Sequence, residues 1–314
     1  FNHYNYSNIL ATGRLANNKF DGRVICSDPN LNFMFHGVFA LAGKSSNSLY
    51  KFNLALGHAD LHALNFDKRE ISRIKLLADA DFTKTKSGDL FGDILIKNFI
   101  CSLGNDNYDV GNINLRSTSY KNDYKLQLKS SFARADYAGT APISSFVSDL
   151  LKLTAEHHLS HLFETKEKAE GLPDINENYN FNLQTFDMRP VCSFLMPGLY
   201  VEDRTNINVR MTSDDKLKIN INSPLLAYKH NFIRDLDLTV DNRDGMITTI
   251  VRSGMLQSGK VKGYDAIIKA LVKDNAIGLN LGFNNGEEAA TYADLNARVS
   301  FPEPKENGLN IIAD

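Results

Sequence analysis

The sequence predicts a mainly β fold: a long antiparallel meander interrupted by one small helical insert. Apolar and polar residues alternate over many short runs, polar turn clusters separate these runs, and helical spacing is confined to one stretch. The clearest runs follow one another with no helical segment between them to cover their apolar faces. These two runs place on one face Leu217, Ile219 and Ile221 in the first strand and Leu236, Leu238 and Val240 in the second.

Residues 20–141 read as a succession of strands of about 6 to 11 residues, separated by polar turns such as Gly104-Asn105-Asp106-Asn107. After residue 199 the alternation resumes, and Ile277, Leu279 and Leu281 mark the clearest late strand. These runs predict a first β segment over 1–141 and a second over 199–314.

One local pattern recurs, in which two residues rather than one separate the first apolar residue from an alternating run. It begins at Ile71, at Val110 and at Ile233. The three-residue step breaks the two-residue period of a pleated strand. Each first apolar residue is therefore expected in a bulge or an entering turn. The copies are unevenly spaced, which excludes a solenoid repeat.

The segment 142–198 differs from its surroundings and predicts the helical insert. Apolar residues between Pro142 and Phe163 follow helical spacing, and a proline suits a first helical turn. A charged linker and one strand starting near Tyr179 follow. A second short helix is expected from Met188 to Met196, because Pro197-Gly198 ends it.

Composition excludes several classes of function. The 314 residues are 43% hydrophobic, enough for a sizeable buried surface, and 35 basic residues face 37 acidic ones. With no basic block, a nucleic acid is not expected as partner. No apolar run approaches the ~20 residues of a membrane-spanning helix. Three widely spaced cysteines give neither a disulfide framework nor a zinc site. The polar start at Phe1 is expected of a fragment of a longer protein.

The strongest cluster of reactive side chains is EHHLSHLFE, in which His157 and His161 lie four residues apart on one helical face. Such a pair can chelate Zn²⁺ or Ni²⁺. The glutamate of a metalloprotease motif is misplaced, however, so an exposed histidine-rich helix end is the simpler interpretation. The stretch after Asp174 lacks the glycine and distal glutamate of a calcium loop. No nucleophile elbow, phosphate loop or dinucleotide fingerprint is present, so neither an enzyme nor a cofactor is predicted.

What covers the apolar faces is left open by the sequence. They could pack on one another as a closed β-sandwich, or they could line an open, water-shielded trough. A meander of about 18 strands must curl, split or flatten, which favours a curled, taco-like apolar groove. An outer-membrane barrel is disfavoured by the absent tryptophan and the helical insert. The side chains predicted to face the groove are Phe181, Leu183, Ile207, Val209, Leu217, Ile219, Ile221, Leu236, Leu238, Val240, Ile277, Leu279 and Leu281.

Four stretches of the chain can be compared with a known family. They are FDGRVICSDPNLNFMFHGVFAL, the strand KFNLALGHADLHALNFDKRE that follows it, FLMPGL at 194–199 and NSPL at 222–225. These stretches resemble the middle region of the TamB (translocation and assembly module) proteins of Bacteroidetes-type bacteria. Each is weak alone, and their order and spacing carry the resemblance over nearly the whole chain.

The resemblance implies a periplasmic segment of a protein anchored in the inner membrane, similar in plan to AsmA-like and bridge-like lipid transfer proteins. It implies phospholipid acyl chains as ligands, and an outer-membrane barrel partner of the TamA or BamA type that binds through regions outside this chain. It implies phospholipid transport and protein assembly at the outer membrane, and no catalytic residue. The insert at 142–198 departs from the plain pattern and is expected to plug, cap or flank the groove. The alternative is a closed β-sandwich that scaffolds outer-membrane protein assembly without binding lipid.

Overall fold

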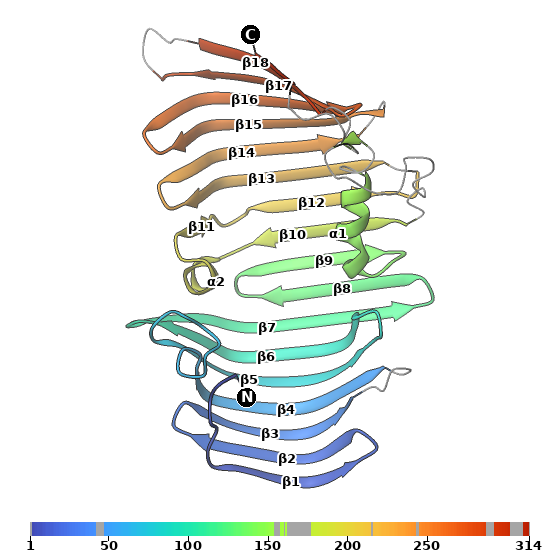
Figure 1. The fold of residues 1–314 in the computed structure, drawn as a ribbon, viewed down its shortest axis with the longest axis vertical. Helices are drawn as coiled ribbons and strands as arrows, with labels where there is room; N and C mark the ends of the chain where they lie inside the picture. Colours follow the sequence, from blue (N-terminus) through green and yellow to red (C-terminus); the bar gives the residue numbers. More distant parts are fainter. Residues whose placement is uncertain are drawn as a thin grey trace. The chain divides into compact units, whose positions relative to one another are not determined.

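The structure is a computed structural model that describes residues 2–41, 47–153, 158–159, 161, 177–214, 216–242, 245–286, 292–301 and 310–313. Over these residues it contains nineteen strands and two short helices. The strands pair antiparallel in an open sheet that is not closed into a barrel (Figure 1). The predicted mainly β meander with a small helical insert is confirmed.

Contacts divide the chain into two compact units. Unit 1 comprises Phe1–Lys121, Lys125–Ala135 and Asp187–Pro197, and unit 2 comprises Asn122–Tyr124, Asp136–Phe186 and Gly198–Asp314. The segment limits at 141 and 198 expected from the sequence follow the change from strand alternation to helical spacing and back. The contact-based units differ from them because the second helix packs with the early strands.

Unit 1 is built from strands that follow one another in sequence and in space. The first seven strands pair successively, each with its neighbour in sequence, in antiparallel register. Its elements are β1 (Ile9–Ala16), β2 (Lys19–Asp28), β3 (Leu31–Ala40), β4 (Ser48–Asp60), β5 (Ser72–Lys84), β6 (Leu90–Leu103), β7 (Asp106–Tyr120), most of β8 (Asp123–Ser130) and α2 (Arg189–Leu195). β9 (Ala133–Gly139) crosses the boundary between the units.

Unit 2 follows the same plan, except that β11 and β12 lie along the same edge of β13. Its other strands pair in sequence order. Its elements are α1 (Ile143–Leu151), β10 (Tyr179–Thr185), β11 (Leu199–Val201), β12 (Asn206–Met211), β13 (Leu217–Tyr228), β14 (Asn231–Asp241), β15 (Ile247–Ser258), β16 (Val261–Lys273), β17 (Ala276–Asn284), β18 (Tyr292–Ser300) and β19 (Asn310–Ala313).

The two helices lie where the sequence places them. α2 occupies seven of the nine residues predicted, with Pro190 in its first turn. α1 begins directly after Pro142, and its described part ends at Leu151. Most of the remaining residues of the predicted helix, up to 163, lie outside the described ranges. In the part of the chain that is described, neither helix has the length and apolar run that crossing a membrane requires.

The three-residue steps in the sequence coincide with irregular backbone. Ile71 has a φ of 53° directly before β5, which makes it an entering turn. Gly111 in β7 has a φ of 77° where the pairing with β6 shifts register, and Asp235 in β14 has a φ of 53°. A residue with a positive φ turns the strand, so the apolar side chains before and after it lie on the same face of the sheet. The entering turn at Ile71 and the bulge at Val110 are found as predicted, because Val110 has no Cα partner on β6. The prediction for Ile233 is wrong, because this residue pairs regularly with Leu226 and Leu256 and the irregular residue is Asp235.

A row of glycines bends unit 1 at a second place. Gly13, Gly22 and Gly37 are successive Cα partners across β1, β2 and β3. A Cβ on Gly37 would lie 2.2 Å from the carbonyl oxygen of Lys51, so the neighbouring backbone approaches too closely for any side chain. Glycine at these positions lets the sheet curve.

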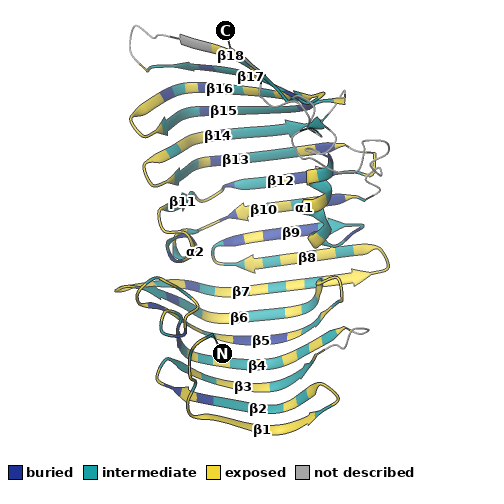
Figure 2. Cartoon of the chain, in the orientation of Figure 1, coloured by how far each residue is buried: buried dark blue, intermediate teal, exposed yellow. Residues whose placement is uncertain are grey.

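Burial alternates along the strands as expected of a sheet with one apolar face. The colours of Figure 2 alternate between half-buried and exposed along β3, β4 and β8. Fully buried apolar residues are few and scattered along the described chain. The apolar faces are therefore mostly half-buried, in contrast to the fully buried positions of a packed core.

Candidate functional site: the apolar faces of the sheet

The strand register brings the predicted groove residues of unit 2 into continuous rows. Ile219 lies opposite Val240 on β14 and opposite Val209 on β12, and Val209 lies opposite Phe181 on β10. Directly paired residues of antiparallel strands project to the same face of the sheet. A parallel row two residues further along each strand consists of Leu183, Ile207, Ile221 and Leu238.

The same rows continue across the later strands. Leu238 pairs with Val251, which pairs with Ile268, and Ile268 pairs with Leu281. The neighbouring row passes from Val240 through Thr249 and Ala270 to Leu279. Leu217, Leu236 and Ile277 have the same parity on their strands. All thirteen residues predicted to face a groove therefore share one surface, here called the apolar face of unit 2. Whether lipid contacts this surface stays a prediction.

One end of this face is covered by α1. Tyr179, Met211 and Leu217 form a row of Cα partners and are 1%, 0% and 2% exposed. The ring of Phe146 on α1 lies 5.4 Å from the ring of Tyr179, whose hydroxyl donates a hydrogen bond to Asp149 on the same helix. Burial beside that carboxylate raises the pKa of Tyr179, which stays protonated as the donor.

Away from α1 the exposure of the face varies, because Leu236 is only 7% exposed whereas the later strands carry exposed leucines. Leu279 and Leu295, which lie in neighbouring rows of the same face, are 39% and 53% exposed. Ile219, Ile221 and Leu238 are half-buried although they lie on central strands. A second packed sheet would bury these side chains almost completely. The arrangement is a single apolar layer with a capped end.

Three buried hydroxyls on this face are satisfied within the protein. They are the side chains of Thr185, Thr205 and Ser223. The Thr205 hydroxyl lies 2.6 Å from the Ser223 hydroxyl, and the Thr185 hydroxyl donates to the carbonyl oxygen of Glu202 at 3.0 Å. These hydroxyls link neighbouring segments of the sheet and offer no unpaired donor to a polar ligand.

The histidine cluster has a structural contact at its described end. His161 lies beside the start of β17. Its backbone N–H donates to the side-chain oxygen of Asn275 at 2.9 Å, and its ring Nδ1 lies 2.9 Å from the carbonyl oxygen of Phe301. His157, the other half of the predicted metal pair, lies outside the described residues. The residues that are described contain no group of three or more metal-binding side chains.

Unit 1 carries a second apolar face, which the sequence reasoning did not single out as a site. Its rows follow the same register logic and are rich in aromatic residues on β2 to β5. The rings of Phe20 and Phe39 lie 5.2 Å apart, and those of Phe35 and Phe52 lie 5.3 Å apart. All four are half-buried. The alternation of Phe52, Leu54 and Leu56 was the available signal for this face.

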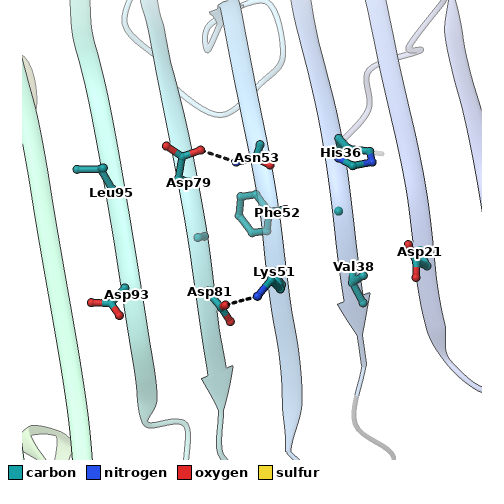
Figure 3. Close-up of a pocket in the computed structure, with 12 residues that line it drawn as sticks. Asp21, His36, Val38, Lys51, Phe52, Asn53, Asp79, Asp81, Asp93 and Leu95 are labelled. Carbon is teal, nitrogen blue, oxygen red and sulfur yellow. Dashed lines mark hydrogen bonds and ion pairs between the residues drawn. The ribbon is translucent and has the colours of Figure 1, made fainter.

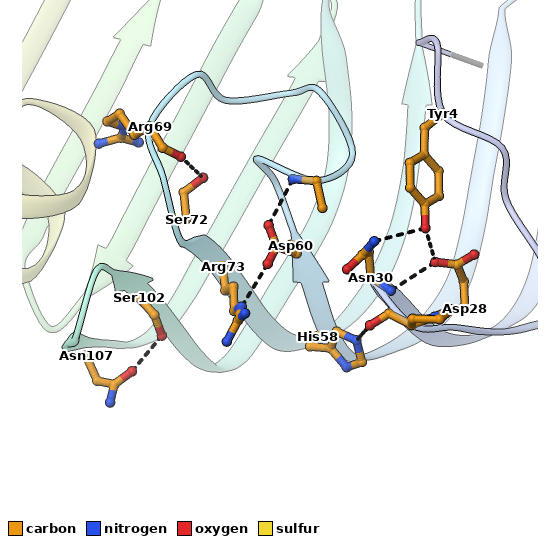
Figure 4. Close-up of polar contacts among 12 residues, drawn as sticks. Tyr4, Asp28, Asn30, His58, Asp60, Arg69, Ser72, Arg73, Ser102 and Asn107 are labelled. Carbon is orange, nitrogen blue, oxygen red and sulfur yellow. Dashed lines mark hydrogen bonds and ion pairs between the residues drawn. The ribbon is translucent and has the colours of Figure 1, made fainter.

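A rim of irregular segments covers one end of this face in unit 1. The N-terminal segment is fixed to the β2–β3 turn. The Tyr4 hydroxyl donates to Asp28 at 2.5 Å (Figure 4). The Ser7 backbone N–H donates to the same carboxylate at 2.9 Å. These donors hold the pKa of Asp28 well below its usual range. Asp28 is only 3% exposed.

The rest of the rim consists of the loop 61–71 and α2. Arg69 pairs with Asp67 and donates a hydrogen bond to the backbone carbonyl of Phe194 on α2, and its guanidinium lies 5.0 Å from the centre of the Phe194 ring. Phe194 packs in turn against Cys101 and Val110 of the sheet. The helix therefore flanks the sheet of unit 1, as the sequence allowed.

The opposite face of unit 1 is polar. A hollow of about 490 Å³ on it is lined by residues of β2 to β6 that include four aspartates and Lys51, together with apolar residues such as Val38 and Leu95 (Figure 3). Lys51 and Asp81 form an ion pair at 2.6 Å, and Asp79 accepts from Asn53 at 2.5 Å. Lys97 also binds Asp79, at 3.1 Å. These paired, exposed charges are typical of a solvated outer surface.

The chain was compared with protein-family models, with curated proteins and with solved structures, and none of the three comparisons gave a match.

Proposed function

We propose that the chain is a lipid-shielding segment whose apolar faces hold the acyl chains of phospholipids while the head groups stay in water. It acts without catalysis and without a cofactor. In line with its resemblance to the TamB family, it works in the periplasm as part of a protein anchored in the inner membrane. There it supports phospholipid transport to the outer membrane and protein assembly in that membrane, where the barrel partner binds other regions.

The observation that carries this proposal is the open, continuous apolar face of unit 2. Its rows cross seven paired strands, namely β10 and the strands from β12 to β17. The row from Ile219 to Leu279 and the row from Ile221 to Leu281 contain no charged side chain. An acyl chain that leaves a bilayer costs about 0.8 kcal/mol for each CH₂ exposed to water. A continuous apolar lining removes this cost along its whole length.

The three buried hydroxyls on this face also support the proposal. Because Thr185, Thr205 and Ser223 hydrogen-bond to one another or to the backbone, these three hydroxyls are already engaged and do not select a head group. Such a face favours long apolar chains of many kinds over a ligand that requires polar recognition.

The experiment is photo-crosslinking in cells. A photoreactive residue replaces Ile219 or Leu238 on the apolar face, and matched variants carry it at Lys218 or Thr239, the neighbouring positions on the outer face. Phospholipid adducts are expected at the first two positions and not at the controls. Adducts to protein alone at Ile219 and Leu238 would favour the closed β-sandwich scaffold and reject lipid binding.

A further inference from the structure

Helix α2 lies on the apolar face of unit 1, against β6 and β7. Its Phe194 is buried and shares a cluster with Cys101 of β6 and Val110 of β7. Val191, one turn earlier in the helix, packs against the same cluster. The helix therefore covers part of the apolar face with two of its own apolar side chains.

Two rows of the apolar face reach this cluster. Both rows cross the strands from β4 to β7, where one arrives at Ile113 and the other at Tyr108. Ile113 and Tyr108 both pack against the cluster. The first row consists of Leu54, Ala78, Ile96 and Ile113, and the second of Ala59, Ile74, Cys101 and Tyr108. An acyl chain that followed either row across the sheet would meet α2.

The helix itself is short and lightly held. It has seven residues, whereas an isolated helix needs about 12 to 15 residues to be marginally stable in water. Its buried residues are Cys192 and Phe194, and its last residue, Leu195, is exposed. Elements with few buried contacts open at a lower free energy than the rest of a fold. The position of α2 therefore depends on its contacts with the sheet and with the loop 61–71.

Arg69 in that loop makes a polar contact with the helix. Its guanidinium donates to the backbone carbonyl of Phe194 and lies 5.0 Å from the centre of the Phe194 ring. The ion pair with Asp67, at 2.5 Å, fixes the guanidinium in this position. The Phe194 carbonyl lies in the last turn of α2, where carbonyl groups lack partners within the helix. Arg69 therefore acts as a latch on the residue that anchors α2.

We propose that α2 is a displaceable plug: an acyl chain on the apolar face of unit 1 takes the place of Val191 and Phe194, and the helix leaves the sheet. This inference rests on the proposed function, because the acyl chain is the displacing ligand. Burying a valine and a phenylalanine side chain is equivalent to burying about four to seven methylenes, so one acyl chain offsets the loss. While no lipid is bound, the plug keeps the residues beneath it from water.

The three native cysteines report the position of the plug. Cys192 lies on α2, Cys101 lies beneath the helix, and Cys26 lies on β2 outside the cluster. All three are buried. The intact chain is treated with iodoacetamide, with and without phosphatidylcholine vesicles, and mass spectrometry follows the labelling of each thiol.

The expected result is a different response at each cysteine. With vesicles, Cys192 should be labelled at least about five-fold faster, because it leaves the sheet with the helix. Cys101 should stay protected, because the acyl chain replaces the helix above it, and Cys26 should be unchanged. Faster labelling of all three thiols would indicate a general loosening of the fold and would overturn the proposal.

A substitution of Arg69 tests the latch without lipid. In Arg69→Gln both Cys101 and Cys192 should be labelled at least about three-fold faster, because the helix opens with nothing to replace it. The matched control is Arg73→Gln, since Arg73 forms its ion pair with Asp60 of the sheet, at 2.9 Å. Equal labelling of the two variants would overturn the role of Arg69.

The vesicle experiment uses the unchanged chain, so it decides the test even if Arg69→Gln does not fold. Binding of a fluorescent phospholipid, measured on the same samples, separates the plug from the proposed function. Bound phospholipid with unchanged labelling of Cys192 would reject the plug and leave the proposed function intact. Absence of bound phospholipid would reject both.

Discussion

Two leucines on the apolar face of unit 2 separate an open face from a packed core. Leu217 is 2% exposed beneath the end that α1 covers, whereas Leu279 is 39% exposed. Both lie on strands paired on each side. Replacing leucine by alanine removes about three CH₂ equivalents, or about 2.4 kcal/mol when the side chain is fully buried.

Leu217→Ala also leaves an enclosed cavity, which raises its expected loss of stability to about 3 to 4 kcal/mol. Leu279→Ala removes a side chain that is about three-fifths buried and opens no enclosed cavity, so its expected loss is about 1.5 kcal/mol. Urea unfolding followed by far-UV circular dichroism measures both, since the chain has no tryptophan. Equal losses of about 3 kcal/mol would show that the face is a closed core and would refute the open layer.

Three further predictions follow from local geometry. Gly37→Ala should destabilise unit 1 by more than about 2 kcal/mol, because its Cβ would meet the backbone of β4. Gly104→Ala, at a φ of 60° with open space around it, should cost about 1 kcal/mol. The urea midpoints of the two variants compare these losses, and similar midpoints would contradict the close approach at Gly37. The pKa of Asp28 is lowered in the folded state. The contribution of the Asp28 carboxylate to stability is therefore complete above the ordinary pKa of 3.8 and is lost only as the pH falls well below that value. The Ser7 amide, which donates to Asp28, should stay protected from hydrogen exchange at pH 4, and loss of this protection between pH 5 and 4 would contradict the lowered pKa. Burial raises the pKa of Cys101 from 9.0 to about 11, so its thiolate fraction at pH 8 is about 100-fold below that of an ordinary thiol. In the folded protein Cys101 should therefore resist iodoacetamide under conditions that modify the unfolded chain. Rapid labelling of Cys101 in the folded protein would contradict its burial.

Alternation was sufficient to predict which side chains share a face. The two-residue period is strict over residues 217–221 of β13 and over residues 236–240 of β14, directly after the irregular residue Asp235. The turn that connects the two strands is short. A one-residue slip would have moved either apolar set to the opposite face, so the burial of that set determines the register. The row from Ile221 to Leu238 follows from this.

The covering elements were not predictable from the same patterns. α1 has a clear amphipathic sequence, but the choice of Tyr179 as its contact depends on residues about 30 positions apart. The Tyr4–Asp28 contact and the Arg69–Phe194 contact are likewise long-range and have no periodic signal. The aromatic face of unit 1 was visible as alternation, yet its significance depends on the row of partners that only the register supplies.

The central claim is that acyl chains lie on the apolar face of unit 2, and a charge placed on that face tests it most directly. Ile221→Asp puts a carboxylate beside Ile207 and Leu238, and Asn220→Asp puts the same group on the outer face of the same strand.

The measurement is the affinity of each variant for a fluorescent phospholipid. The carboxylate in Ile221→Asp is expected to keep about three methylenes of the acyl chain from contacting the face. The lost binding free energy is about 2.4 kcal/mol, which weakens binding about 60-fold. Asn220→Asp should change the affinity less than about three-fold, because its side chain lies on the other side of the sheet. Equal affinities of the two variants and the unchanged chain would contradict the proposed function.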